Sequence, residues 1–182
     1  PLQDAQRAIR IVRQNAEQWN IDGSQIGVMG FSAGGHLAST LGTHYNEDTL
    51  KGINTDPINS ISARPDFMML IYPVITFDKK YYHGGSKNAL VGENAKQETV
   101  DYFSNNLQVT KDTPSTFLVH SADDKVVPVA NSILFYEALI KQKVSAEMHL
   151  YPEGGHGYSF AIGKGRLEGW TDRLYEWIRE LE

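Results

Sequence analysis

The chain has 182 residues, of which 41% are hydrophobic and 21% charged, and this composition is typical of one soluble globular domain. Its net charge of -5 offers no basic surface, so we expect neither a nucleic-acid partner nor a membrane partner. The absence of cysteine excludes disulfides, thiolate metal sites and a cysteine nucleophile.

Hydrophobic periodicity predicts alternating helices and strands along the chain. Apolar residues at steps of three and four predict an amphipathic helix from Leu2 to Trp19. The nearly continuous apolar run at 66–75 is typical of a parallel strand covered on both faces, and it is too short to cross a bilayer. The other predicted elements, in chain order, are a strand at 25–31, a helix at 34–43, a short helix at 94–103, a strand at 115–120, a helix at 131–143, a strand at 146–151, and a last helix with Trp170, Leu174, Trp177 and Leu181 at core spacing.

This alternation predicts an α/β fold, a mostly parallel sheet flanked by helices, over a single domain at residues 1–182. In such sheets the reactive groups gather at the carboxyl ends of the strands. The connection at 77–114 is unusually long, and it is either a cap over the site or a plain surface excursion.

The most informative motif is GFSAG at residues 30–34, which joins a predicted strand to a predicted helix. In this context a serine sits at a sharp turn with its hydroxyl exposed for nucleophilic attack. Ser32 is therefore the candidate nucleophile, and the alternative is a serine that caps the following helix.

A serine nucleophile requires a base, and the base requires an acid that orients it. His156 follows the strand at 146–151 among glycines, and it is the candidate base. Asp123 and Asp124 follow the strand at 115–120, and either carboxylate could orient His156. Asp124 could instead be a favourable charge before the next helix.

Three motifs in this order resemble the α/β-hydrolase superfamily: GFSAGGHLA at 30–38, H-x-x-x-D-x-x-V-P at 120–128, and GGHG at 154–157. The chain is most similar to the esterase subgroup of bacterial acetylxylan esterases and prolyl-oligopeptidase-type hydrolases. The resemblance covers essentially the whole chain. It implies the triad Ser32, Asp124 and His156, with Asp124 preferred over Asp123.

The resemblance further implies a serine esterase that removes short acyl groups, acetyl above all, from esters such as those of plant polysaccharides. The reaction would pass through an acyl-enzyme, with the backbone N–H of Ala33 as one oxyanion donor and with no cofactor or metal. The substrate would be a small-molecule or saccharide ester. A prolyl-oligopeptidase-type peptidase and a non-catalytic fragment of a hydrolase are the alternatives.

The glycine-rich loop that supplies the second oxyanion donor in this family does not occur before Ser32. The four predicted strands correspond to the second half of the family's sheet, so the strand before Ser32 would have an unpaired apolar edge. We therefore expect the chain to be the carboxyl-terminal part of a longer enzyme, with the N-terminal strands absent. A preceding segment would then be required, and this part alone would be nearly inactive.

Overall fold

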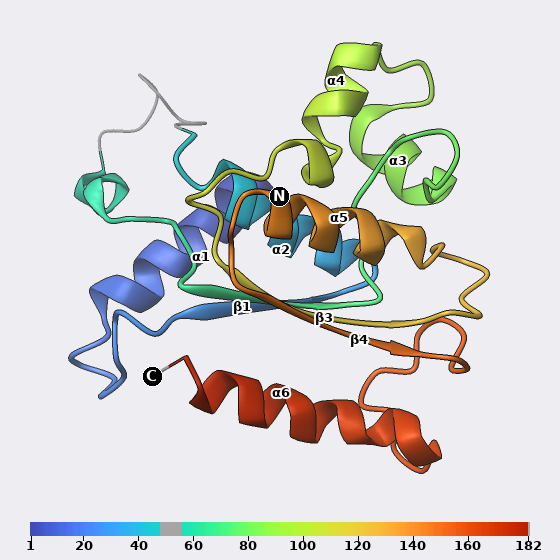
Figure 1. Cartoon of the computed structure of the whole chain (residues 1–182). Helices are drawn as coiled ribbons and strands as arrows, with labels where there is room; N and C mark the ends of the chain where they lie inside the picture. Colours follow the sequence, from blue (N-terminus) through green and yellow to red (C-terminus); the bar gives the residue numbers. More distant parts are fainter. Residues whose placement is uncertain (48–55, 182) are drawn as a thin grey trace.

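The computed structural model describes residues 1–47 and 56–181, and a parallel sheet forms its centre (Figure 1). The described strands lie in the order β1-β2-β3-β4, and each pairs in parallel with its neighbour. This confirms the predicted α/β fold. The strands are β1 (Gly27–Phe31), β2 (Phe67–Ile71), β3 (Ser115–Ser121) and β4 (Ala146–Tyr151).

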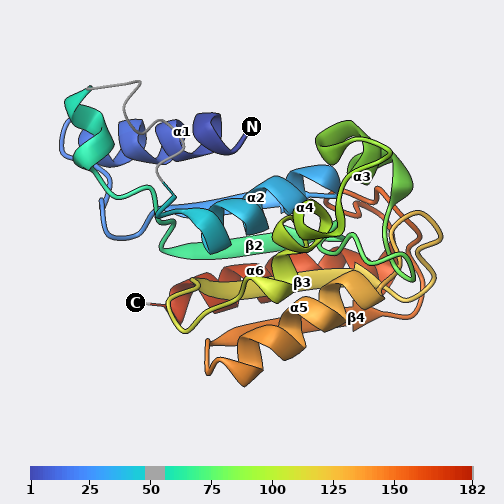
Figure 2. The ribbon, with the colours of Figure 1, turned by 90° about the horizontal axis from the view of Figure 1, so that it is seen from above.

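Helices cover both faces of the sheet. Helix α6 lies along one face, whereas α2 and α5 lie along the other, with α1 packed beside α2 (Figures 1 and 2). The short helices α3 and α4 stand above α2 and α5, within the long connection. The helices are α1 (Leu2–Gln14), α2 (Ala33–His44), α3 (Gly84–Val91), α4 (Gln97–Tyr102), α5 (Ala130–Lys141) and α6 (Trp170–Arg179), with short 3-10 turns at Pro57–Ser60, Asn105–Leu107 and Gly165–Gly169.

The alternation of side chains along β2 divides the hydrophobic core in two. Met69 and Ile71 face the α6 side, where they join Trp170 and Trp177 in one cluster. Leu70 faces the opposite side and joins a second cluster beneath α2 and α5. Every residue of β2 is buried, which confirms the prediction of a strand covered on both faces.

Two predicted elements end at least four residues earlier than the sequence pattern indicates. Helix α1 ends at Gln14 instead of Trp19, and the Trp19 side chain is half exposed. Strand β2 ends at Ile71 because Tyr72 adopts a positive φ of 39°, a backbone conformation that leaves the extended strand. Pro73 follows and has no N–H with which to continue the ladder.

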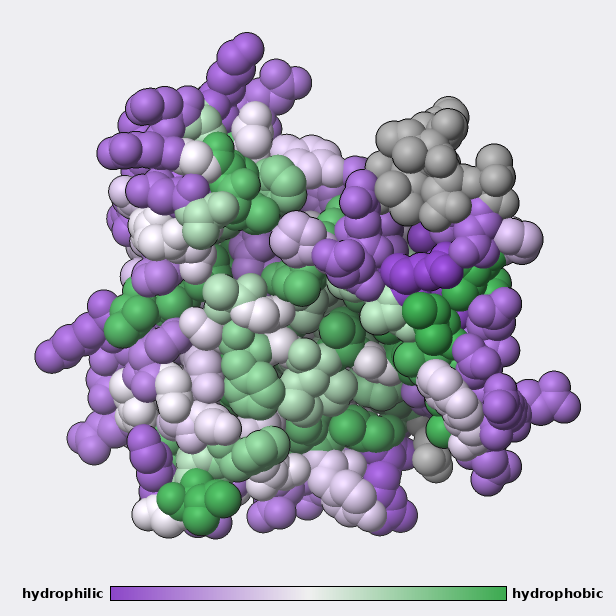
Figure 3. Space-filling model, turned by 180° about the vertical axis from the view of Figure 1, so that it is seen from behind, coloured by the Kyte–Doolittle hydropathy of each residue, from purple (hydrophilic) through white to green (hydrophobic). Residues whose placement is uncertain are grey.

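Strand β1 lies at one edge of the sheet formed by the described strands. Figure 3 views the molecule from the β1 side and shows apolar side chains gathered at the centre of this face. Met29 of β1 is 38% exposed. The expectation of an open, apolar edge beside Ser32 is thus met by the described part of the chain. No helix among the described residues is long and apolar enough to cross a membrane.

Candidate active site

Ser32 occupies a strained turn between β1 and α2. Its φ of 51° and ψ of -121° lie outside the regions that a residue with a Cβ atom prefers. Two hydrogen bonds from the β2 side hold it there: the Ser32 N–H donates to the Ile71 carbonyl, and the Val74 N–H donates to the Ser32 carbonyl. The turn is therefore fixed by the sheet and by the segment that follows β2.

Small residues around Ser32 are required because the backbone passes very close to itself. A Cβ atom at Gly30 would lie 2.2 Å from the Gly34 carbonyl oxygen, and one at Gly35 would lie 2.6 Å from Pro73 Cβ. A Cβ atom at Gly34 would meet no atom within 4 Å. Packing therefore requires glycine at position 30, the first of the GFSAG motif, and at position 35, directly after the motif. It does not require glycine at position 34.

The structure brings the three predicted side chains together. Ser32 Oγ lies 2.8 Å from His156 Nε2, and His156 Nδ1 lies 2.6 Å from Asp124 Oδ2. With Asp124 ionised, Nδ1–H donates to the carboxylate, which leaves Nε2 free to accept the Ser32 hydroxyl proton. Ser32 is the N-cap residue of α2, but its side chain makes no capping hydrogen bond. The hydroxyl faces the imidazole instead.

The Asp124 carboxylate is buried but fully provided with hydrogen-bond donors. Oδ1 accepts from the backbone N–H groups of Val126 and Val127, both at 2.9 Å, and Oδ2 contacts His156 and His120. Burial alone would raise the pKa of Asp124, but the hydrogen bonds from His120, His156 and the two backbone N–H groups outweigh burial and lower the pKa to about 2. Asp124 is therefore anionic at neutral pH.

Asp123, the alternative acid, has a different partner. Its Oδ1 accepts a hydrogen bond of 2.8 Å from the Gly155 N–H, immediately before His156. Gly155 has a φ of 63°, which favours glycine at this position. Asp123 thus fixes the loop that carries the imidazole, whereas Asp124 contacts the imidazole itself. Asp124 does not lie in the first turn of the next helix, since α5 begins only at Ala130.

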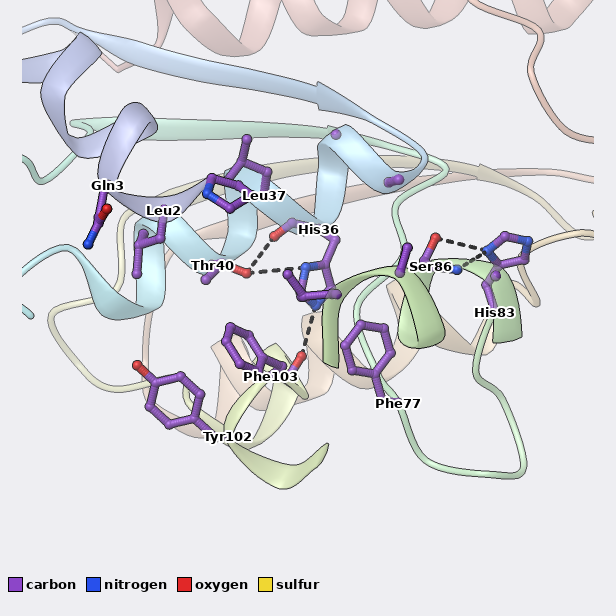
Figure 4. A pocket seen from close by; sticks show the side chains of 16 residues that line it. Leu2, Gln3, His36, Leu37, Thr40, Phe77, His83, Ser86, Tyr102 and Phe103 are labelled. Atoms are coloured by element: carbon purple, nitrogen blue, oxygen red, sulfur yellow. Dashed lines mark hydrogen bonds between the residues drawn. The ribbon is translucent and has the colours of Figure 1, made fainter. Parts of the chain in front are cut away.

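A cavity of about 880 Å³ lies next to the turn that carries Ser32. Figure 4 shows several of the residues that line it. Ala33 and Gly34 of α2 form one wall, and the segment at 77–103, with α3 and α4, forms the opposite wall. The long connection is therefore a wall of a cavity that adjoins the site. Its role as a cap stays a prediction.

His36 joins the two walls of this cavity. Its ring stacks on Phe77 with centroids 4.7 Å apart, and its Nε2 lies 2.8 Å from the Phe103 carbonyl oxygen. Burial lowers the pKa of His36 to about 4, so the ring is neutral at pH 7 and Nε2–H donates to the carbonyl. Figure 4 shows His36 between Phe77, Phe103 and Thr40. His36 thus ties α2 to the connection.

With this geometry established, comparison with known proteins identifies the family. The model of the family described as BD-FAE matches residues 1–139. The chain belongs to the BD-FAE family. The match runs from α1 into α5, and so includes Ser32 and Asp124 but not His156.

Similar proteins place this BD-FAE chain among the α/β-hydrolases of esterase type. A solved acetyl ester-xyloside bifunctional hydrolase from Caldicellulosiruptor lactoaceticus is 46% identical, with a TM-score of 0.93 over all of this chain and 65% of that one. Endo-1,4-beta-xylanase B from Butyrivibrio fibrisolvens is 41% identical over 96% of the chain. An acetylxylan esterase from Xylanibacter ruminicola is 32% identical over the whole chain. The chain spans 27% and 36% of the lengths of these last two relatives.

Two residues beside the candidate site, Tyr72 and His120, make contacts with His156 and Asp124 that were not predicted from the sequence. The ring of Tyr72 lies edge-on to that of His156, with centroids 4.9 Å apart, and its hydroxyl accepts a hydrogen bond from the Ser159 N–H. His120 contacts the Asp124 carboxylate. The H-x-x-x-D spacing was the available signal for His120, because it places the histidine at the end of the strand before the acid. No sequence signal predicts the positive φ of Tyr72.

Proposed function

We propose that the protein is a serine esterase in which Ser32 is the nucleophile, His156 the general base and Asp124 the acid that orients it. The observation that carries this proposal is the continuous series of contacts from Ser32 Oγ through the imidazole to the Asp124 carboxylate, at 2.8 Å and 2.6 Å. All three residues lie at the carboxyl ends of parallel strands, where α/β proteins assemble their sites.

In the first half of the reaction Ser32 Oγ attacks the ester carbonyl carbon while its proton passes to His156 Nε2. Asp124 remains ionised and stabilises the imidazolium that forms. The tetrahedral intermediate then collapses, the bond to the alcohol oxygen breaks, and His156 returns the proton to that oxygen. The alcohol leaves, and the acyl group stays on Ser32.

In the second half a water molecule attacks the acyl group and gives a proton to His156. Collapse of this second intermediate releases the carboxylic acid and returns the proton to Ser32. Ala33 is the first residue of α2, and its backbone N–H is the proposed oxyanion donor at this helix start. The second donor is expected from a segment before Pro1, and this expectation stays a prediction.

The proposed substrate is a short-chain acyl ester, in particular an acetyl ester, of a plant polysaccharide. The names of the Caldicellulosiruptor hydrolase and the Xylanibacter esterase support it, since both refer to acetyl esters and to xylan or xyloside chemistry. The cavity beside Ala33 supports a binding site at this end of the sheet.

A panel of substrates tests the proposed function. The wild-type protein is used at its full natural length, because the chain alone is expected to be nearly inactive. It is expected to hydrolyse nitrophenyl acetate faster than nitrophenyl esters of longer acyl chains, to release acetate from acetylated xylan, and to leave a prolyl-nitroanilide intact. The Ser32→Ala variant is the control for spontaneous hydrolysis. Preferential cleavage of the prolyl amide would assign a peptidase instead, and equal rates for wild type and Ser32→Ala would indicate a fold without a working site.

A further inference from the structure

His120 is a second histidine in contact with the acid of the proposed triad. It lies in β3, one residue before the end of the strand, and its side chain is fully buried. Its Nε2 is 3.2 Å from Asp124 Oδ2 and 3.0 Å from the Val127 carbonyl oxygen. Its Nδ1 is 2.8 Å from Ser132 Oγ, on α5.

These partners determine which nitrogen carries the proton. A carboxylate oxygen and a carbonyl oxygen can only accept hydrogen bonds, so Nε2 must be protonated to face both. Ser132 can donate to Nδ1 through its hydroxyl, which completes the neutral ring. A histidine that merely filled space in the core would not have two acceptors converging on one nitrogen.

We propose that His120 is a positioning residue that fixes the Asp124 carboxylate toward His156. Oδ1 is held by the two backbone N–H groups of the 126–127 turn, and Oδ2 is shared by the two imidazoles. Without the His120 donor, Oδ2 would keep only His156, whose Nε2 takes up and returns a proton during the proposed reaction. This inference rests on the proposed function, because positioning has a consequence for rate only if Asp124 takes part in catalysis.

The surroundings of Asp124 add few other titratable groups. Tyr72 packs against His156, and Tyr158 lies close enough for the Asp124 charge to raise its pKa, although burial is the larger cause of that rise. Helix α5 contributes only the neutral Ser132 to this contact, and Asp123 is turned toward the Gly155 N–H. Among the described residues the two histidines are thus the side chains that donate hydrogen bonds to the carboxylate.

Two substitutions of His120 separate positioning from packing. His120→Phe keeps a ring of similar size and removes the donor, whereas His120→Gln keeps an N–H donor at the end of the side chain. His149→Phe is the matched control, because His149 lies on the adjacent strand, contacts Glu147 and Phe117, and makes no contact with Asp124. Thermal unfolding of each variant checks that it folds.

The first readout is the titration of the Asp124 carboxyl group, followed by carbon NMR in each protein. In His120→Phe this titration is expected to move to higher pH, because one of the hydrogen bonds that lower the pKa is lost. In His120→Gln and in the His149→Phe control it should stay near the wild-type position. A carboxyl titration that is unchanged in His120→Phe would overturn the proposal.

The second readout is the kinetics of nitrophenyl acetate hydrolysis. We expect kcat to fall about ten- to hundredfold in His120→Phe with KM unchanged, a loss of the size seen when the hydrogen-bond partner of a metal-binding side chain is removed. His120→Gln should recover most of this loss. Equal losses in the Phe and Gln variants would indicate a packing role and contradict the inference.

A third measurement needs no variant, so it tests the proposal even if His120→Phe does not fold. Long-range proton–nitrogen NMR of wild-type protein with labelled histidine should show His120 protonated at Nε2, and protonation at Nδ1 alone would overturn the proposal. These NMR readouts do not depend on turnover. A wild-type protein that hydrolyses no ester would therefore refute the proposed function while the inference about His120 is still tested.

Discussion

Alanine in place of Ser32 or of His156 is expected to lower kcat for nitrophenyl acetate by about 10⁴-fold or more. Without Ser32 no acyl-enzyme can form. Without His156 the hydroxyl would keep its proton, because His156 Nε2, 2.8 Å from Ser32 Oγ, is the proposed base. The measurement is steady-state hydrolysis corrected for the spontaneous rate in buffer.

The double variant Ser32→Ala/His156→Ala tests whether the two side chains act together. Two groups that act as one unit do not contribute independently, so the double variant should lose no more activity than either single variant. His149→Ala is the control, since this histidine is partly exposed and bonded to Glu147 on β4. Losses that multiply in the double variant, or a His156→Ala protein as active as wild type, would show that the two side chains do not cooperate.

The second large effect is expected from Asp124→Asn, which should lower kcat by about 10⁴-fold while leaving the fold intact. The structure predicts how the new amide would sit. The Val126 and Val127 N–H groups both require an acceptor, so the amide oxygen would remain at the Oδ1 position. The amide NH₂ would then replace Oδ2 and point at both imidazoles.

An NH₂ group in that position reverses the hydrogen bond to the base. His156 Nδ1 would have to accept it, so the ring proton would move to Nε2, which could then no longer accept the Ser32 proton. Asp123→Asn is the matched control, because its amide oxygen can still accept from the Gly155 N–H. Kinetics of the two variants, measured side by side, check this prediction. A larger loss of kcat in Asp123→Asn than in Asp124→Asn would show that Asp123, and not Asp124, is the acid.

Much of the fold could be predicted because its signals are local. The uninterrupted apolar run at β2 indicates a strand covered on both faces, and the alternation with amphipathic helices indicates a parallel sheet. The residues at which the helices and strands end were harder to predict from the sequence. The end of β2 depends on the positive φ of Tyr72, which is stabilised by tertiary hydrogen bonds such as that from its N–H to the Val119 carbonyl.

Part of the candidate site could likewise be predicted from the sequence, and part could not. Ser32, His156 and the Asp123–Asp124 pair could be found from motifs at strand ends, and the resemblance favoured Asp124. Which aspartate contacts the imidazole depends on a turn of a few residues, which no periodicity reports. Helix α3 was not predicted, because its eight residues lack a strong apolar stripe and none of them is buried.

Covalent labelling with a fluorophosphonate probe, followed by peptide mass spectrometry, tests whether Ser32 is the nucleophile and His156 its base. Such a probe reacts with a serine whose hydroxyl is activated by a base. We expect Ser32 to be modified in wild-type protein, Asp123→Asn to keep most of this labelling, and His156→Ala to abolish it. Modification of another serine, or labelling of Ser32 that survives the loss of His156, would contradict the assignment of Ser32 and His156 as nucleophile and base.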